Sequence, residues 1–280
     1  MKLKQLFLTL FVCIGLSSCD KTIEVGIITG HTDKYHNCEK MVPHIEQVFS
    51  ENANIKTTII DINLAQNSVI DFTKYDAVIM NINEVEWNDT QKQNFEDYMY
   101  NGGGMVVVHE ADNAFPEWKA YNEMIGLGGW GGRNIQSGPF YYYSNGEFVT
   151  DSLTEGEGGK HGRSGPYEIK VRDEEHPIMK GLPTSWVHYD DELYGNLRGP
   201  AQNIHPLATA FSDSTTGGTG KEELVLFTVT YGKGRIFHTV LGHTGKDYDK
   251  SLKNNRGFDV TLLRGTEWAA TGEVQSKCTF

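Results

Sequence analysis

The chain has 280 residues and a formal net charge of −12 at pH 7. Such an acidic chain is a poor match for nucleic acid, whose phosphate backbone is bound through Lys and Arg. A neutral sugar or a bound cation remains compatible with this charge.

The N-terminal sequence predicts a secretory signal peptide over residues 1–18. Lys2 and Lys4 give it a positive start, and the apolar run that follows is too short to span a bilayer as a permanent helix. The run ends in the sequence LSSC, which resembles the lipobox at which bacterial lipoproteins are cleaved and acylated. We therefore expect Cys19 to carry a lipid. An ordinary signal peptide followed by an incidental Cys is the alternative.

Removal of this peptide would take the charge from −12 to −14, because Lys2 and Lys4 leave with it. We expect residues 19–22 to form a lipid-anchored tether, residues 23–273 a single domain and residues 274–280 a C-terminal tail. The protein would be a cell-envelope lipoprotein, periplasmic or attached to the outer membrane, that contacts the membrane only through its acyl chains.

Two of the four cysteines, Cys38 and Cys278, lie in the expected mature chain in addition to the anchor. A disulfide between them would tie the start of the domain to its end in an oxidising periplasm. Two unpaired thiols are the alternative, because the sequence does not supply the distance between the two residues.

Apolar and β-branched runs alternate with amphipathic stretches along the first part of the domain. Helices are expected over residues 36–49, 89–101 and 258–271, the second capped by Asp89 or Thr90. Strands are expected at residues 23–29, 55–62, 75–82, 105–108, 139–143, 167–171, 207–211, 224–231 and 235–241. This alternation predicts an α/β fold with a mostly parallel central sheet covered on both faces. Residues 126–165, rich in Gly and aromatic residues, are expected to form an irregular cap of loops and hairpins.

Several polar residues follow predicted strands, where ligands of such sheets bind. His31, His109 and His243 come at three strand ends, and a separate loop carries Asp191 and Glu192. A single His at a strand end is often only a surface or capping residue, and the acidic pair could be a solvated turn. Three such histidines would converge on one crevice, and this convergence favours a functional site.

Further residues are candidates for contacts with a ligand. Aromatic rings stack on the apolar faces of sugars, and polar side chains bind their hydroxyls. Trp118 and Trp130 are core anchors in the alternative interpretation. The candidate substrate-binding residues are His31, His36, Glu110, Trp118, Trp130, His161, Tyr189 and Tyr194.

Six motifs follow one another along the expected domain: GGGMVVVH at residues 102–109, HPIMKGLP at 176–183, DELY at 191–194, YGKGR at 231–235, LGH at 241–243 and RGTEWAATG at 264–272. Together they resemble the ThuA-like (trehalose utilisation) proteins, and their order is more specific than any one of them. The resemblance covers the whole expected domain. It implies the flavodoxin-like, three-layer fold of the class I glutamine amidotransferases and a role in the use of sugars, in particular 3-keto disaccharides and glycosides.

The turn at which amidotransferases place their catalytic Cys corresponds here to Val108, His109 and Glu110. It contains no Cys or Ser, and this absence argues against amidotransferase and cysteine peptidase activities. There is also no P-loop, and we expect no nucleotide site. Histidines and carboxylates suit acid–base catalysis or a divalent metal.

We therefore expect His109, His243, Glu192 and Asp191 to be catalytic, and His31, His109, His243 and Glu192 to be the candidate ligands of a divalent metal. A base could remove the C2 proton of a 3-keto sugar, and elimination or isomerisation would follow. A non-catalytic sugar-binding lipoprotein is the alternative, and an interaction module would leave the clustered histidines unexplained. An oligomer is compatible with the sequence.

Overall fold

The computed structural model describes residues 22–30, 35–50, 52, 54–62, 69–83, 85–245, 251–277 and 280. The predicted signal peptide, the anchor Cys19, the candidate ligand His31 and Cys278 lie outside these residues. The predicted acylation and the predicted disulfide are therefore not addressed by the structure. None of the helices among the described residues has the length and apolar character that a membrane crossing needs.

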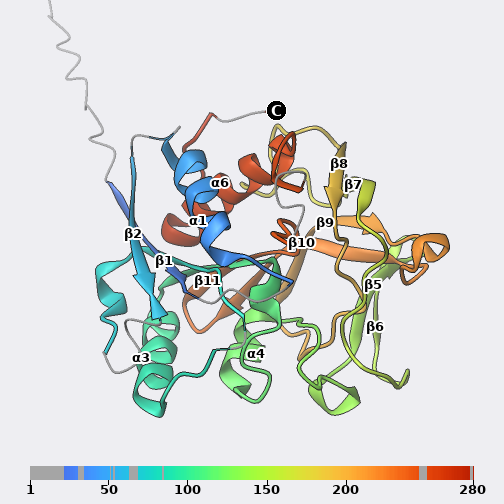
Figure 1. The fold of residues 1–280 in the computed structure, drawn as a ribbon, viewed down its shortest axis with the longest axis horizontal. Helices are drawn as coiled ribbons and strands as arrows, with labels where there is room; N and C mark the ends of the chain where they lie inside the picture. Colours follow the sequence, from blue (N-terminus) through green and yellow to red (C-terminus); the bar gives the residue numbers. More distant parts are fainter. Residues whose placement is uncertain are drawn as a thin grey trace, which may run out of the picture.

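The described chain forms an α/β fold with a large sheet (Figure 1). The helices are α1 (Cys38–Ser50), α3 (Asp89–Tyr100), α4 (Lys119–Ile125) and α6 (Arg256–Thr271). The strands are β1 (Ile23–Thr29), β2 (Ile55–Asp61), β3 (Ala77–Met80), β4 (Gly104–Val108), β5 (Phe140–Ser144), β6 (Glu147–Asp151), β7 (Gly165–Val171), β8 (Ser185–Asp191), β9 (Ile204–Phe211), β10 (Glu222–Tyr231) and β11 (Gly234–Thr239).

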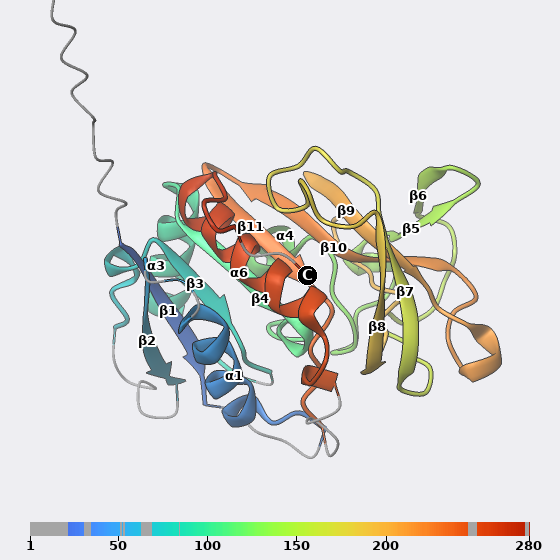
Figure 2. The same cartoon turned by 90° about the horizontal axis from the view of Figure 1, so that it is seen from above.

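The sheet has the strand order β2-β1-β3-β4-β11-β10-β9-β7-β8, and the β5–β6 hairpin is attached to β10. The strands from β2 to β11 are parallel, and those from β10 to β8 are antiparallel. Helices α1 and α6 cover one face of the parallel half, and α3 and α4 cover the other (Figure 1). The antiparallel strands extend from this three-layer part, as seen from above (Figure 2). The predicted flavodoxin-like fold is confirmed, with a mixed sheet around a parallel core.

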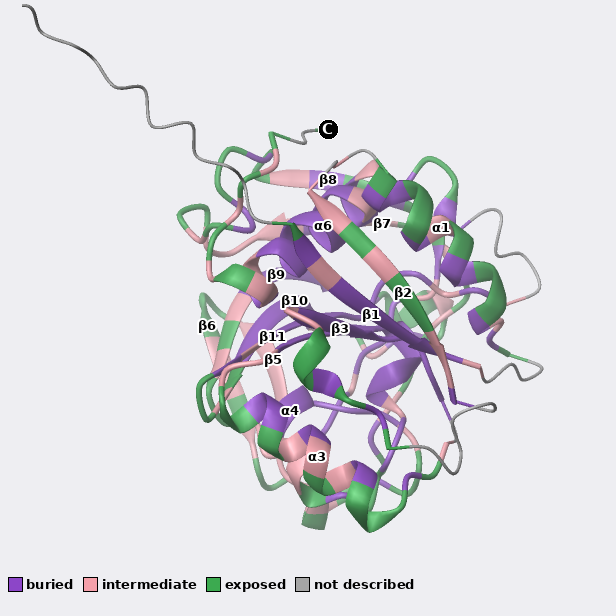
Figure 3. Cartoon of the chain, turned by 90° about the vertical axis from the view of Figure 1, so that its left-hand side faces the viewer, coloured by how far each residue is buried: buried purple, intermediate pink, exposed green. Residues whose placement is uncertain are grey.

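The parallel strands form because their side chains are apolar on both faces. All residues of β3 and β4 are buried, as expected for strands between two helical layers. Figure 3 shows these buried central strands beside the partly exposed edge strand β2. The sheet therefore holds the carboxyl ends of β1, β3, β4 and β11 side by side along one edge.

Two helix ends show how local sequence sets the boundaries. Helix α3 begins with a capping box in which the Asn88 side chain accepts from the Gln91 N–H. The predicted caps, Asp89 and Thr90, were wrong by one and two residues. Helix α6 ends at Gly272, as predicted, because this residue adopts a left-handed conformation with φ of 85°.

The sequence interpretation missed two elements. The segment around His188, expected to be a loop, is strand β8, which pairs antiparallel with β7. Its buried residues, such as Trp186 and His188, alternate with the exposed Val187 and Tyr189. Helix α4 has only seven residues and gave no clear periodicity. Residues 126–165 contain the β5–β6 hairpin within otherwise irregular loops, as expected of the cap.

Candidate functional site

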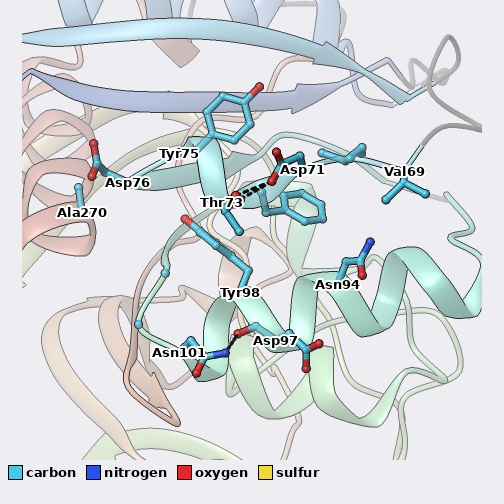
Figure 4. A pocket seen from close by; sticks show the side chains of 14 residues that line it. Val69, Asp71, Thr73, Tyr75, Asp76, Asn94, Asp97, Tyr98, Asn101 and Ala270 are labelled. Carbon is cyan, nitrogen blue, oxygen red and sulfur yellow. Dashed lines mark hydrogen bonds between the residues drawn. The ribbon is translucent and has the colours of Figure 1, made fainter.

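Two cavities lie at opposite edges of the parallel sheet. The smaller, of about 610 Å³, lies at the amino ends of β3 and β4 and is bordered by Asp71, Tyr75 and Tyr98 (Figure 4). None of the predicted site residues lines it. The larger, of about 1290 Å³, lies at the carboxyl ends, where ligands of this fold bind. Seven of the predicted site residues line it: His36, Trp118, Trp130, His161, Glu192, Tyr194 and His243.

His109 lies directly after β4, buried behind Tyr194 and His243 of the cavity wall, and does not itself line the cavity. Hydrogen bonding to β3 and β11 fixes the strand end, and His109 itself has a φ of 44°. A left-handed conformation at a residue other than Gly costs about 1–3 kcal/mol and is concentrated at functional sites. The turn thus aims a buried imidazole toward His243, which follows β11.

The hydrogen bonds of His109 define its protonation. Its Nδ1 lies 2.7 Å from the carbonyl oxygen of Val240, which can only accept, so Nδ1 carries the proton. Burial, together with the nearby His243 and His36, lowers the pKa of His109 well below its ordinary value. The ring is therefore neutral, and the lone pair of Nε2 faces Nδ1 of His243 at 3.2 Å.

Three histidines from three different connections meet at this point. His36 precedes α1, His109 follows β4 and His243 follows β11. One ring nitrogen of each lies within 4.8 Å of the others. Neutral imidazoles are common ligands of divalent transition metals, and a ligand His usually donates its other N–H to a carbonyl or carboxylate, as His109 does. The three side chains therefore form a candidate metal site. His109 and His243 are two of the predicted metal ligands, whereas His36 was predicted to bind substrate.

Glu192 adds a carboxylate to this cluster. Its Oε2 lies 3.5 Å from Nδ1 of His243 and 3.7 Å from Nε2 of His161. Both Glu192 and His161 line the cavity. The cluster thus combines a carboxylate that can take a proton with a fourth histidine, His161, at its rim.

Tyr194 forms one wall of the cluster. Its hydroxyl lies 2.8 Å from Nε2 of His36, and its ring packs on His109 and Trp130 at centroid distances of 3.9 and 4.4 Å. Burial and the negative charge of Asp112 raise the pKa of Tyr194 well above its ordinary value. Tyr194 therefore remains a neutral phenol that can hydrogen-bond a ligand or orient His36.

Asp191 does not line the cavity, although it was predicted to be catalytic. Its buried carboxylate accepts the backbone N–H groups of Gly242 and His243, at 2.8 and 3.1 Å, and lies 2.7 Å from Nε2 of His188. It therefore fixes the backbone that presents His243. The geometry gives Asp191 a supporting position behind the cluster.

Three more predicted site residues lie apart from the cavity or support its wall. Glu110 is buried behind the turn, where it accepts a hydrogen bond from the Cys38 thiol at 3.1 Å, and burial raises its pKa to about 7. Tyr189 is half-exposed on β8 and is held through its backbone by Asn255. Trp118 borders the cavity, but its indole N–H donates to Glu96.

The structure also adds residues that the sequence interpretation did not single out. Trp87 and Phe115 line the cavity from the connections after β3 and before α4, and Asp190 lines it at the end of β8. Phe115, Asp190 and the predicted Trp130 all have positive φ values of 47–50°. No sequence signal marks this conformation at Phe115 or Asp190, so these two positions were not identified from the sequence.

Comparisons with known proteins agree with the fold and the motifs. The profile of the ThuA family, described as trehalose utilisation, matches residues 24–269. A ThuA-like protein from Parabacteroides merdae is 42% identical, with 92% of this chain and 93% of that chain covered and a TM-score of 0.85. No curated protein matches.

More distant structures share the fold alone. A ThuA-like protein from Bacteroides uniformis is 17% identical, with a TM-score of 0.60 over 91% of this chain and 93% of that chain. The protein STM3548 from Salmonella typhimurium is 9% identical, with a TM-score of 0.51 over 91% of this chain and all of that chain. With the family profile matching most of its length, the chain belongs to the ThuA family, which is associated with trehalose utilisation.

Proposed function

We propose that the protein is an exported enzyme that acts on 3-keto disaccharides or glycosides by metal-assisted enolisation, followed by elimination or isomerisation. The observation that carries this proposal is the cluster of His36, His109 and His243, whose ring nitrogens lie within 4.8 Å of one another. The family supports a sugar as substrate, and the lipobox-like sequence before Cys19 supports export.

The chemistry needs a proton acceptor and a means of stabilising an enolate. A ketone at C3 acidifies the proton on C2, and Glu192 is the cavity-lining carboxylate placed to accept it. The C2–H electron pair then forms the enolate, with its negative charge on the C3 oxygen. A divalent cation held by the three histidines would supply Lewis-acid stabilisation of that oxygen. Tyr194 lies beside the cluster as a hydrogen-bond donor, and His161 lies beside Glu192.

Two outcomes follow from one enolate. In elimination, the C3 carbonyl is restored, the electron pair of the C2–C3 double bond forms a C1–C2 double bond, and the C1–O bond breaks. The departing oxygen takes a proton and leaves as an alcohol. In isomerisation, C2 is protonated again on the other face, so the C1–O bond survives. Both outcomes balance without an oxidant or a reductant.

A non-catalytic sugar-binding protein would use the same cavity. Binding a neutral sugar requires hydroxyl partners and apolar surface. It does not require a neutral His109 whose proton is fixed by Val240 and whose lone pair faces a second imidazole. This arrangement therefore favours the enzyme.

The test is His109→Asn, with metal content, turnover and melting temperature measured on the purified protein. Asn tolerates the positive φ at this position. We expect loss of bound zinc or manganese and a fall in turnover of 3-ketotrehalose of about 10²-fold or more, the usual scale for acid–base or ligand groups. NMR of the products would separate elimination from isomerisation.

His205→Asn is the matched control, because His205 is exposed and pairs with Asp173 away from the cavity. It should leave metal content and turnover unchanged. If His109→Asn retains turnover but melts at a lower temperature, His109 is a core residue that supports the turn. Turnover that survives complete removal of metal by a chelator would contradict the metal-assisted mechanism.

A further inference from the structure

Backbone groups fix two of the three pairs of segments that carry the histidines of the cluster. His109 donates through Nδ1 to the carbonyl oxygen of Val240. The backbone N–H of Asn37 donates to the carbonyl oxygen and to the hydroxyl of Thr244, at 3.2 Å each. Val240 and Thr244 lie on either side of His243, and Asn37 follows the first histidine of the cluster.

A side-chain hydrogen bond joins the remaining pair of segments, those of His36 and His109. Cys38, the first residue of α1, lies two residues after His36, and Glu110 directly follows His109. The Cys38 thiol donates to Oε1 of Glu110 at 3.1 Å, and both side chains are buried. Because side chains make this link, it can be removed without altering a histidine.

We propose that Cys38 is a positioning residue of the histidine cluster, whose thiol holds the turn of His109 at a fixed place relative to His36 before a metal binds. It does so through its hydrogen bond to Glu110. The metal rests on the proposed function, whereas the positioning of the two rings does not depend on it. Cys38 acts here as a reduced thiol and does not itself ligate the metal.

The backbone of Cys38 is a fixed point at the edge of the sheet. Its carbonyl oxygen accepts from Nδ2 of Asn81 at 3.0 Å, and the same amide group lies 3.2 Å from the hydroxyl oxygen of Thr29. Thr29 is the last residue of β1, and Asn81 directly follows β3. The start of α1 is thus attached to two strand ends independently of the thiol.

The other end of the link lies in a strained turn. His109 has a φ of 44°, and a residue other than Gly keeps such a conformation only where the surrounding contacts hold it. The next side chain, Glu110, accepts from the thiol through Oε1, while its Oε2 is buried without a hydrogen-bond partner among the described residues. Loss of the thiol would therefore release the carboxyl, and relaxation of the turn would move the His109 ring.

A purely structural role for the pair is the alternative. Two apolar side chains would fill the same space without burying a carboxyl, which is costly unless it is hydrogen-bonded. Polar residues that orient metal ligands are typical of metal sites, and their loss weakens metal binding by about 10- to 100-fold. The position of this polar pair, within two residues of two histidines of the cluster, favours positioning.

The first test measures zinc binding to the metal-free protein by competition with a chromophoric chelator. We expect Cys38→Ala, which removes the donor, to bind Zn²⁺ about 10-fold more weakly. Cys38→Ser keeps a donor and should bind Zn²⁺ like the wild type. Tyr98→Phe is the matched control, because it removes a buried hydrogen bond to Gly104 at the opposite edge of the sheet. It should lower the melting temperature and leave the zinc affinity unchanged.

The second test follows the positions of the rings without a metal. In NMR spectra of the metal-free protein, Cys38→Ala should shift the ring signals of His36 and His109, whereas Tyr98→Phe should not. The link also needs a thiol. When the full-length protein isolated from cells is unfolded without a reductant, Cys38 should therefore react with iodoacetamide.

Four results would overturn the proposal. They are a wild-type zinc affinity in Cys38→Ala, unchanged ring signals in this variant, an equal loss of zinc affinity in Cys38→Ser or Tyr98→Phe, and a Cys38 that reacts only after reduction. A wild-type protein that binds no zinc, but whose ring signals shift in Cys38→Ala as expected, would contradict only the metal-assisted mechanism of the proposed function.

Discussion

At the scale of single residues, the side chains of two neighbouring acidic residues at the end of β8 point to opposite sides. Glu192 lines the cavity beside His243 and His161, whereas the Asp191 carboxylate faces away and binds backbone. The difference follows from the alternation of side chains along a strand, since successive residues point to opposite sides. Asp191 therefore orders the loop that carries His243, and Glu192 is the acidic residue of this pair that we expect to contact the ligand.

The variant Asp191→Asn tests whether Asp191 stabilises the loop that carries His243 or takes part directly in catalysis. The amide keeps the shape but loses the charge. Its NH₂ group would face two donors at either oxygen position, the N–H groups of Glu192 and His243 or the N–H group of Gly242 and the ring of His188. Hydrogen bonds to charged groups contribute about 1.5–3 kcal/mol each. We expect a loss of about 2–3 kcal/mol in the free energy of unfolding in urea, together with weaker metal binding.

Asp190→Asn is the matched control for this variant. Asp190 is exposed, and its φ of 50° is one that Asn adopts readily. Its stability should remain close to that of the wild type. An Asp191→Asn protein with unchanged stability but no turnover would instead give Asp191 the direct catalytic role expected from the sequence.

The site residues that could be predicted from the sequence are those that directly follow a predicted strand. His109 and His243 could be placed because each follows an apolar strand, and the ends of parallel strands meet at one edge. His36 follows a stretch of chain after β1 whose path the sequence does not define. The partner of a buried carboxylate such as Asp191 is set by tertiary contacts, which leave no local pattern.

At the scale of elements, the contrast between β4 and β8 explains which parts of the fold were predictable. The sequence of β4 is a continuous apolar run because helices cover both faces of the parallel sheet. β8 has one exposed face and carries His188 and two acidic residues, so its sequence resembles a polar loop. The antiparallel half of the sheet was therefore predicted less completely than the parallel half.

The connection between β7 and β8 contains a pH-sensitive contact between elements. The ring of His176 lies 5.2 Å from Trp268 of α6 and 5.4 Å from His205 of β9. Burial, and then the neighbouring His205, lower the pKa of His176 from 6.5 to about 4, although Asp173 acts in the opposite direction. The folded state therefore favours the neutral ring.

This shift predicts how stability changes with pH. The folded pKa is below the unfolded value, so the unfolded state binds the proton first as the pH falls. The contribution of His176 is fully present above about pH 6.5 and is lost as the pH falls from 6.5 through about 4. His176→Asn retains an acceptor for the Ile178 N–H and should melt with a weaker dependence on pH across this window. An equally steep dependence in the variant would contradict the assignment.

At the scale of the whole molecule, the candidate site joins the two halves of the sheet. His109 and His243 come from the ends of parallel strands, and Glu192 comes from the end of the antiparallel strand β8. The hydrogen bonds of Asp191 to Gly242 and His243 link these halves directly. Movement of the antiparallel half relative to the parallel core would therefore change the distance between Glu192 and the histidines.

The position of the site also bears on the predicted lipid anchor. The cavity lies at the carboxyl ends of the parallel strands, whereas Ile23 begins β1 at the opposite edge. A tether of residues 19–22 spans at most about 14 Å when fully extended. An acylated Cys19 would thus hold the amino edge of the sheet near the membrane, with the cavity facing away from it.

Cys19→Ala tests this arrangement in cells. We expect the variant to lack the mass of the diacylglycerol and to move from the membrane fraction to the soluble or unprocessed fraction, because a lipid chain is its only predicted membrane contact. Turnover per folded molecule should be unchanged, since the site lies at the far edge of the sheet. Cys13→Ala, within the predicted signal peptide, is the matched control and should retain acylation. The same mass and the same fractionation in Cys19→Ala and the wild type would show that Cys19 is not the anchor.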